Sequence, residues 1–141
     1  FDYDFFDREG FVLNPEPACR AVVTARQMNP LLLLPFYEAI SRSFYSENKD
    51  TTDLETFKAL ATEVGLDVDD FTENFNSDDL KQNTKSDFQF SQQLGVSGFP
   101  TMVVKEGDKM ALLTAGYQPY KNLKPAIEDW LDIGFQELPA E

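Results

Sequence analysis

The feature that most constrains this chain is a single change of hydrophobic period near Gly95. Before it, apolar residues recur at the three- and four-residue spacing of amphipathic helices. After it, two short apolar runs at 100–104 and 110–115 flank a Glu-Gly-Asp turn, which is the pattern of a β-hairpin. A two-stranded hairpin is marginally stable alone in water. The sequence therefore predicts an α+β chain whose hairpin needs further strands, and whose open edge invites pairing with another strand.

Helix ends are marked by prolines in first turns, by polar residues that precede a helix, and by glycines that follow one. We expect Asn14 to cap the first helix and Gly65 to end the third. The expected helices cover about 15–29, 30–47, 53–64, 68–75, 78–94 and 121–135, after an irregular aromatic and acidic arm over 1–15.

Apolar spacing predicts which face of each helix is buried. The expected faces are Leu33, Tyr37, Ile40 and Phe44, widened by Phe36, in the second helix; Leu80, Thr84, Phe88 and Ser91 in the fifth; and Leu123, Ile127, Trp130 and Ile133 in the last.

The counts of cysteine and histidine exclude several kinds of catalytic site. The 141 residues contain one Cys and no His, so a His-dependent triad, a His-ligated zinc, an internal disulfide and a Cys-x-x-Cys pair are all excluded. The acidic run Asp67-Val68-Asp69-Asp70 lacks the glycine and the later glutamate of an EF-hand loop. We therefore expect no metal site and no cofactor.

The charge of the chain limits its partners. The formal net charge is −13, which argues against binding to nucleic acid or to an anionic membrane surface. The longest apolar run, Leu31–Leu34, is far too short to span a bilayer. Residues 47–90 hold twelve acidic and four basic residues, which we interpret as a solvated helical face. The first residues show no basic-then-apolar pattern of a signal peptide.

The segment that opens the hairpin resembles a known motif. Gly98-Phe99-Pro100-Thr101 is similar to the Gly-x-Pro-Thr element of thioredoxin-like proteins, where the proline peptide bond is cis and starts a core strand. The resemblance implies that Gly98, Phe99, Pro100 and Thr101 shape a substrate groove. It also implies that the backbone before Pro100 pairs with the substrate chain.

The order of segments along the chain narrows this resemblance to DsbA-like proteins, in the subfamily often assigned as protein-disulfide isomerases and similar to FrnE. The segments that carry it are Asn14–Ala21, Ala39–Tyr45, Ser86–Phe88, Leu94–Thr101 and Gly116-Tyr117. The implied fold is thioredoxin-like of the DsbA type, with an arm at 1–15, a helical insert at 16–95 and the C-terminal part of the thioredoxin-like domain at 96–141. The implied activity is thiol–disulfide exchange with protein or small-thiol substrates, and the implied location is cytoplasmic.

The sequence departs from this family in one large respect. The family begins with a strand–helix–strand segment that carries the redox Cys-x-x-Cys, and no counterpart of it is found in these 141 residues. Disulfide exchange needs an attacking thiolate and a resolving thiol, so we expect no catalytic residue and no turnover from this chain. The missing neighbours of the hairpin belong to that same segment.

Cys19 is the one candidate for a reactive thiol. It falls in the first turn of a predicted helix, where the helix dipole lowers a thiol pKa, and Arg20 adds positive charge while Glu16 opposes it. Free cysteines are more often small, partly buried core residues, and we favour that interpretation. No catalytic role carries over to Cys19 from the family, whose redox motif lies elsewhere.

Two other functions stay open at this stage. The chain can be a non-catalytic module that binds a partner through its acidic helices and the hairpin edge, including a second copy of itself. It can also resemble kappa-class glutathione transferases and hydroxychromene-carboxylate isomerases, which share the architecture. Their chemistry relies on N-terminal residues that are absent here, so we rank this alternative last.

Overall fold

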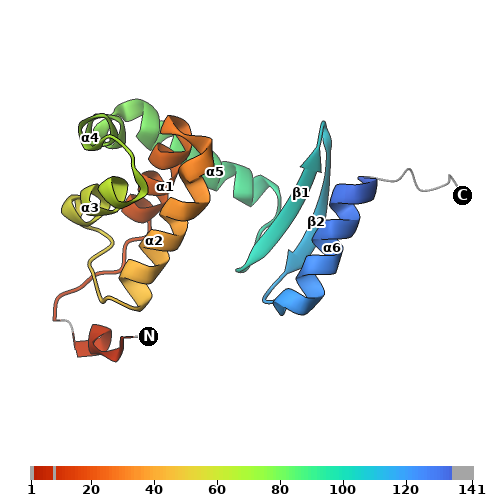
Figure 1. The fold of residues 1–141 in the computed structure, drawn as a ribbon, viewed down its shortest axis with the longest axis horizontal. Coiled ribbons are helices and arrows are strands. Elements are labelled where there is room, and N and C mark those ends of the chain that lie inside the picture. The colour runs from red at the N-terminus through yellow and green to blue at the C-terminus, as the bar shows by residue number, and fades with distance from the viewer. Residues whose placement is uncertain (1, 8, 135–141) are drawn as a thin grey trace, which may run out of the picture. The chain divides into compact units, whose positions relative to one another are not determined.

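The computed structural model describes residues 2–7 and 9–134, and the chain divides into two compact units (Figure 1). We name them the helical unit, Phe1–Gln89, and the hairpin unit, Phe90–Glu141. Together they have the predicted α+β composition. No helix among the residues described is both long enough and apolar enough to cross a membrane.

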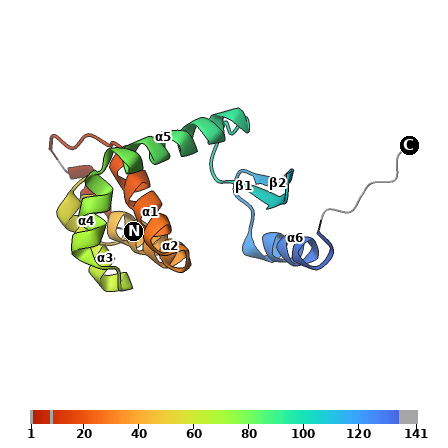
Figure 2. The same cartoon turned by 90° about the horizontal axis from the view of Figure 1, so that it is seen from above.

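The helical unit contains the predicted helices. They are α1 (Glu16–Met28), α2 (Leu33–Tyr45), α3 (Leu54–Val64), α4 (Val68–Asn76) and most of α5 (Asp78–Gln93). Helices α1 to α4 pack against one another, as both ribbon views show (Figures 1 and 2). The prediction of an irregular N-terminal arm is partly wrong, because Tyr3–Asp7 forms a 3-10 helix.

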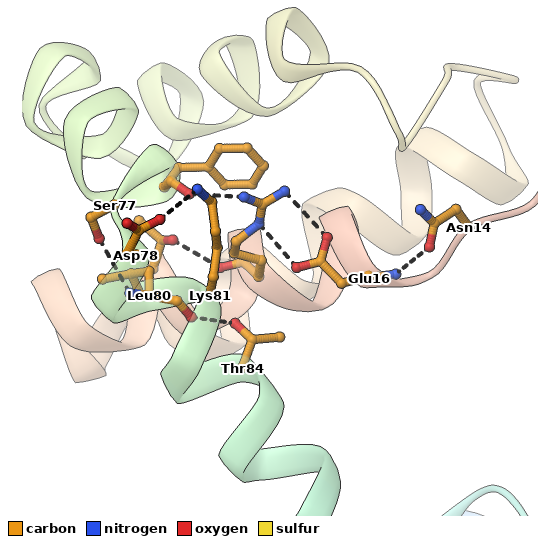
Figure 3. A network of polar contacts seen from close by, with 10 residues as sticks. Asn14, Glu16, Ser77, Asp78, Leu80, Lys81 and Thr84 are labelled. Atoms are coloured by element: carbon orange, nitrogen blue, oxygen red, sulfur yellow. Dashed lines mark hydrogen bonds and ion pairs between the residues drawn. The ribbon is translucent and has the colours of Figure 1, made fainter.

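Side-chain oxygens cap several of the helix starts. The Asn14 side chain accepts a hydrogen bond from the backbone N–H of Glu16, and the Ser77 hydroxyl accepts one from Leu80 at the start of α5 (Figure 3). Asn29 caps a separate 3-10 turn at Pro30–Leu32, so α2 begins three residues later than predicted. Gly65 ends α3 at φ 84°, a left-handed conformation that favours glycine.

The core of the helical unit is built on aromatic rings. Phe36 lies 5.5 Å from Phe71, Phe57 lies 5.6 Å from Phe75, and Phe71 stacks on Phe75 at 6.1 Å, all between ring centroids. Such offset and tilted pairs add to the stabilisation from burial alone. The ring cluster therefore joins α2 and α3 to α4.

The predicted face of α2 is partly wrong. The helix buries Phe36, Ala39, Ile40 and Ser43, whereas Tyr37 is 58% exposed. Apolar residues occur almost all round α2, so their spacing alone does not decide which side is buried. The packing partners of the helix decide it.

The predicted face of α5 is correct only in its first half. Leu80 and Thr84 are buried in the helical unit, while Phe88 and Ser91 are exposed. The Arg26–Asp87 ion pair of 2.9 Å and the hydrogen bond from Asn83 to Gln27 tie the middle of α5 to α1. The helical unit ends at residue 89, whereas α5 continues to Gln93. The last residues of α5 therefore do not pack in the core of the helical unit.

The hairpin unit consists of β1 (Thr101–Glu106), β2 (Lys109–Ala115) and α6 (Tyr120–Ile133). The two strands pair antiparallel, with a bulge that leaves Leu113 without an opposite residue. Helix α6 lies along one face of the hairpin (Figures 1 and 2), and its predicted apolar residues Leu123, Ile127 and Trp130 are half-buried. The sequence also placed Ile133 on this apolar face and extended the helix to about residue 135. The Ile133 side chain and residue 135 lie outside the described part of the chain.

The hairpin has no third strand in the described part of the chain. Strands β1 and β2 pair with each other alone. The N-terminal arm residues whose placement the structure gives form a 3-10 helix and add no strand to the hairpin.

Candidate functional site

The loop between α5 and β1 brings the predicted groove residues together. Gly95 ends α5 at φ 72°, and the Phe99–Pro100 peptide bond is cis. The Thr101 hydroxyl donates a hydrogen bond of 2.7 Å to the carbonyl of Gly98. The backbone N–H of Gly116 donates one of 2.8 Å to the carbonyl of Pro100. These two bonds fix the loop to the end of the hairpin.

A groove of about 520 Å³ lies between this loop and the strands. Gly98, Phe99 and Thr101 line it, whereas Pro100 is not among the lining residues. The Phe99 side chain is 89% exposed, so its ring is available for contact with a bound molecule. The other lining residues are Leu94, Gly95, Val96, Ser97, Val103, Met110, Ala111, Leu112, Ala115 and Gly116.

The chemistry of the groove follows from this lining. All thirteen lining residues are uncharged, in a chain in which 26% of the residues are charged. None of them carries a thiol, a carboxyl group or an amine. The lining can therefore bind an apolar or extended molecule, but it supplies no nucleophile and no general acid or base.

Ten of these lining residues were not singled out as site residues from the sequence, and five of the ten are large and apolar. Leu94 and Val96 come from the loop, and Val103, Met110 and Leu112 come from the strands. A signal for the strand residues was present, because Met102–Val104 and Ala111–Leu113 are continuous apolar runs. Such runs are typical of strands that are covered on both faces, and a half-exposed hairpin would show alternation instead.

Cys19 lies in the helical unit and does not line the groove. It is half-buried in α1. Burial raises the pKa of its thiol, and the negative charges of Glu16 and Asp87 raise that pKa further. The expected lowering of the pKa by the helix dipole is therefore outweighed. This surrounding is that of a structural cysteine, since reactive thiols lie in electropositive environments.

The raised pKa gives a first prediction. We expect iodoacetamide to alkylate Cys19 at neutral pH at least about tenfold more slowly than a cysteine in an unstructured peptide, because the thiolate fraction is smaller and the sulfur is half-buried. The thiolate fraction grows as the pH rises towards the raised pKa, so the rate should increase with pH. Mass spectrometry of timed samples measures both effects, and a rate equal to that of the peptide would contradict them.

The described residues contain no group of three or more His, Cys, Asp or Glu side chains arranged to hold a metal ion.

Comparison with known proteins identifies the family to which the chain is similar. A family model described as thioredoxin matches residues 34–125. No curated protein gives a significant match. A solved structure described as a "putative protein disulfide isomerase" from Nitrosomonas europaea is 38% identical, with a TM-score of 0.89. The match covers 96% of this chain and 66% of that one, just under two thirds.

Two further solved structures share the fold. The cytosolic disulfide reductase DsbM from Pseudomonas aeruginosa is 23% identical at a TM-score of 0.79, with coverage of 95% of this chain and 69% of DsbM. The structure of DsbM with GSH is 22% identical at a TM-score of 0.76, with coverage of 94% and 68%.

Proposed function

The chain belongs to the thioredoxin family, in its DsbA-like branch, and from this premise we propose that it is part of a thiol–disulfide oxidoreductase domain. We further propose that the 141-residue chain has no redox turnover of its own. In this proposal, residues 16–95 are the helical insert and 96–141 are the C-terminal part of the thioredoxin-like domain, preceded by the arm at 1–15.

One observation carries the proposal. The Gly98–Thr101 loop is held against the end of the hairpin by the Thr101–Gly98 and Gly116–Pro100 hydrogen bonds, and Phe99 is presented to solvent beside an uncharged groove. Fold alone does not give function, so the proposal depends on this site. The exposure of Phe99 beside this groove supports our proposal that the loop contacts a substrate chain.

The lack of turnover follows from the number of thiols. Dithiol–disulfide exchange passes through a mixed disulfide, which a second thiol of the enzyme must resolve. The chain contains one cysteine, and that cysteine has a raised pKa and does not line the groove. A single thiol of this kind can at most remain in a mixed disulfide.

The substrate class and the location are proposed from the relatives. One relative is described as a disulfide isomerase and another as a cytosolic disulfide reductase. We propose a protein or a small thiol or disulfide as the substrate of the complete domain, and the cytoplasm as its location.

Insulin reduction tests the lack of turnover. With dithiothreitol as the reductant, we expect the chain to precipitate insulin no faster than dithiothreitol alone does, because no pair of thiols is available. Turbidity over time measures the rate. Cys19→Ser should give the same trace, and a clear acceleration that Cys19→Ser abolishes would show that this lone thiol is redox-active.

A further inference from the structure

We propose that Tyr117 and Phe99 form an aromatic pair at the rim of the groove, and that this pair selects polypeptide substrates with an apolar side chain beside the disulfide over small thiols such as glutathione. This inference rests on the proposed function and deepens it, because the proposed function leaves both substrate classes open. Tyr117 belongs neither to the Gly98–Thr101 motif nor to the groove lining.

The first observation is a backbone hydrogen bond that brings the two aromatic residues together. The N–H of Gly116 donates to the carbonyl of Pro100 at 2.8 Å. Phe99 directly precedes Pro100, and Tyr117 directly follows Gly116. The start of β1 and the end of β2 lie at the same end of the hairpin, where α6 also begins (Figure 1). Because Phe99 and Gly116 both line the groove, the pair borders it.

The second observation is the exposure of the two rings. Phe99 is 89% exposed and Tyr117 is 78% exposed. Gly116 adopts φ 87°, a left-handed conformation that turns the chain out of β2 just before Tyr117. Together the two side chains leave on the order of 300 Å² of surface in solvent. Exposed apolar surface of this extent is typical of interaction sites, and aromatic residues supply much of the binding energy at such sites.

The position of Tyr117 separates this pair from the open edge of the hairpin. The sheet has the order β1-β2, so β1 stands between β2 and that open edge. Tyr117 follows β2, and a strand that joined the edge of β1 would not lie beside it. The exposed ring of Tyr117 is therefore not accounted for by the lack of a third strand.

Charge decides between the two substrate classes. Glutathione carries two carboxylates and one ammonium group, and none of the thirteen groove-lining residues has a charge to pair with them. The net charge of −13 also repels this net negative molecule. An apolar side chain of a polypeptide, in contrast, is stabilised by burial against the rings of Phe99 and Tyr117. These observations favour a polypeptide substrate.

The test is a binding titration of the isotope-labelled chain, followed by the chemical shifts of its backbone amides. The probes are a blocked pentapeptide with a central phenylalanine, the same peptide with alanine in that place, and S-methylglutathione. We expect the phenylalanine peptide to shift the amides of Phe99, Gly116 and Tyr117. We also expect it to bind at least about fivefold more tightly than the other two probes, because they offer no aromatic side chain.

Three variants assign the preference to the ring of Tyr117. Tyr117→Ala should weaken binding of the phenylalanine peptide at least about fivefold, whereas Tyr117→Phe should retain it because the ring is kept. Tyr37→Ala is the matched control. It makes the same chemical change at a tyrosine that is 58% exposed in the helical unit, and it should leave the dissociation constant unchanged.

Several results would overturn the proposal. They are no binding of the phenylalanine peptide, equal binding of the two peptides, tighter binding of S-methylglutathione, and equal effects of Tyr117→Ala and Tyr37→Ala. A dimer of the chain that Tyr117→Ala dissociates would also overturn it, since the aromatic pair would then bind a second copy.

The outcome is separable from that of the redox assay, because none of the three probes carries a free thiol. A preference for S-methylglutathione would overturn the substrate class and leave the proposed oxidoreductase function intact. Turnover of insulin by the chain alone would contradict its proposed inactivity and would not alter the titration.

Discussion

Phe36→Ala is expected to lower the free energy of unfolding of the helical unit by about 3–5 kcal/mol. Phe36 is fully buried, and its ring lies 5.5 Å from that of Phe71, so truncation removes apolar burial and leaves a cavity between α2 and α4. The loss is a large fraction of the stability of a small unit. Urea unfolding followed by circular dichroism at 222 nm measures it.

The neighbouring residue provides the control. Tyr37 is also aromatic and on the same helix, but it points away from the core. Tyr37→Ala should therefore change the unfolding free energy by no more than about 0.5 kcal/mol. If the two variants were equally destabilised, the assignment of the buried face of α2 would be wrong.

Arg20→Ala is expected to cost about 2–3 kcal/mol, the second largest effect. The Arg20 side chain is only 14% exposed. Its guanidinium contacts Glu16 at 3.1 and 3.2 Å, donates to the carbonyl of Phe75 at 3.3 Å, and lies 4.2 Å from the centre of the Phe75 ring. Glu16 reaches into this network from the start of α1 (Figure 3). The substitution therefore removes the polar contact between α1 and the end of α4.

A more exposed arginine on the same helix serves for comparison. Arg26 pairs with Asp87 at 2.9 Å, but both side chains are more than 40% exposed. Solvent screens such a pair, and Arg26→Ala should cost no more than about 1 kcal/mol. Arg20→Lys should recover part of the loss, since lysine keeps the charge and the apolar stem but not the planar fork. A cost for Arg20→Ala no greater than that for Arg26→Ala would contradict the account of the buried network.

Local signals in the sequence predicted most of the helices and the hairpin. Gly65 and Gly95 mark helix ends because glycine adopts positive φ without steric cost, and Asn14 caps α1 with an oxygen that the backbone N–H groups need. The change from helical to strand period located the hairpin to within a few residues. These signals act over about four residues, which is why they can be read from the sequence.

The candidate site was predicted only in part. The motif identified Gly98–Thr101, but it gave no indication that Leu112, eleven residues after Thr101, lies in the same groove. That neighbourhood depends on the strand register and on the bulge at Leu113, because a slip of one residue would turn Leu112 to the other face. Register is a property of the paired strands and not of either run alone.

The sequence by itself determined the six α-helices and the hairpin to within a few residues, the single thiol and the resemblance to DsbA-like proteins. The tertiary structure alone decided that Phe36 and not Tyr37 faces the core, that the second half of α5 is exposed, and that the pKa of Cys19 is raised. The physical reason is the range of the interactions. Capping and turn formation involve near neighbours, whereas burial and electrostatic environment depend on side chains that the fold brings from other helices, as it brings Asp87 to the surroundings of Cys19.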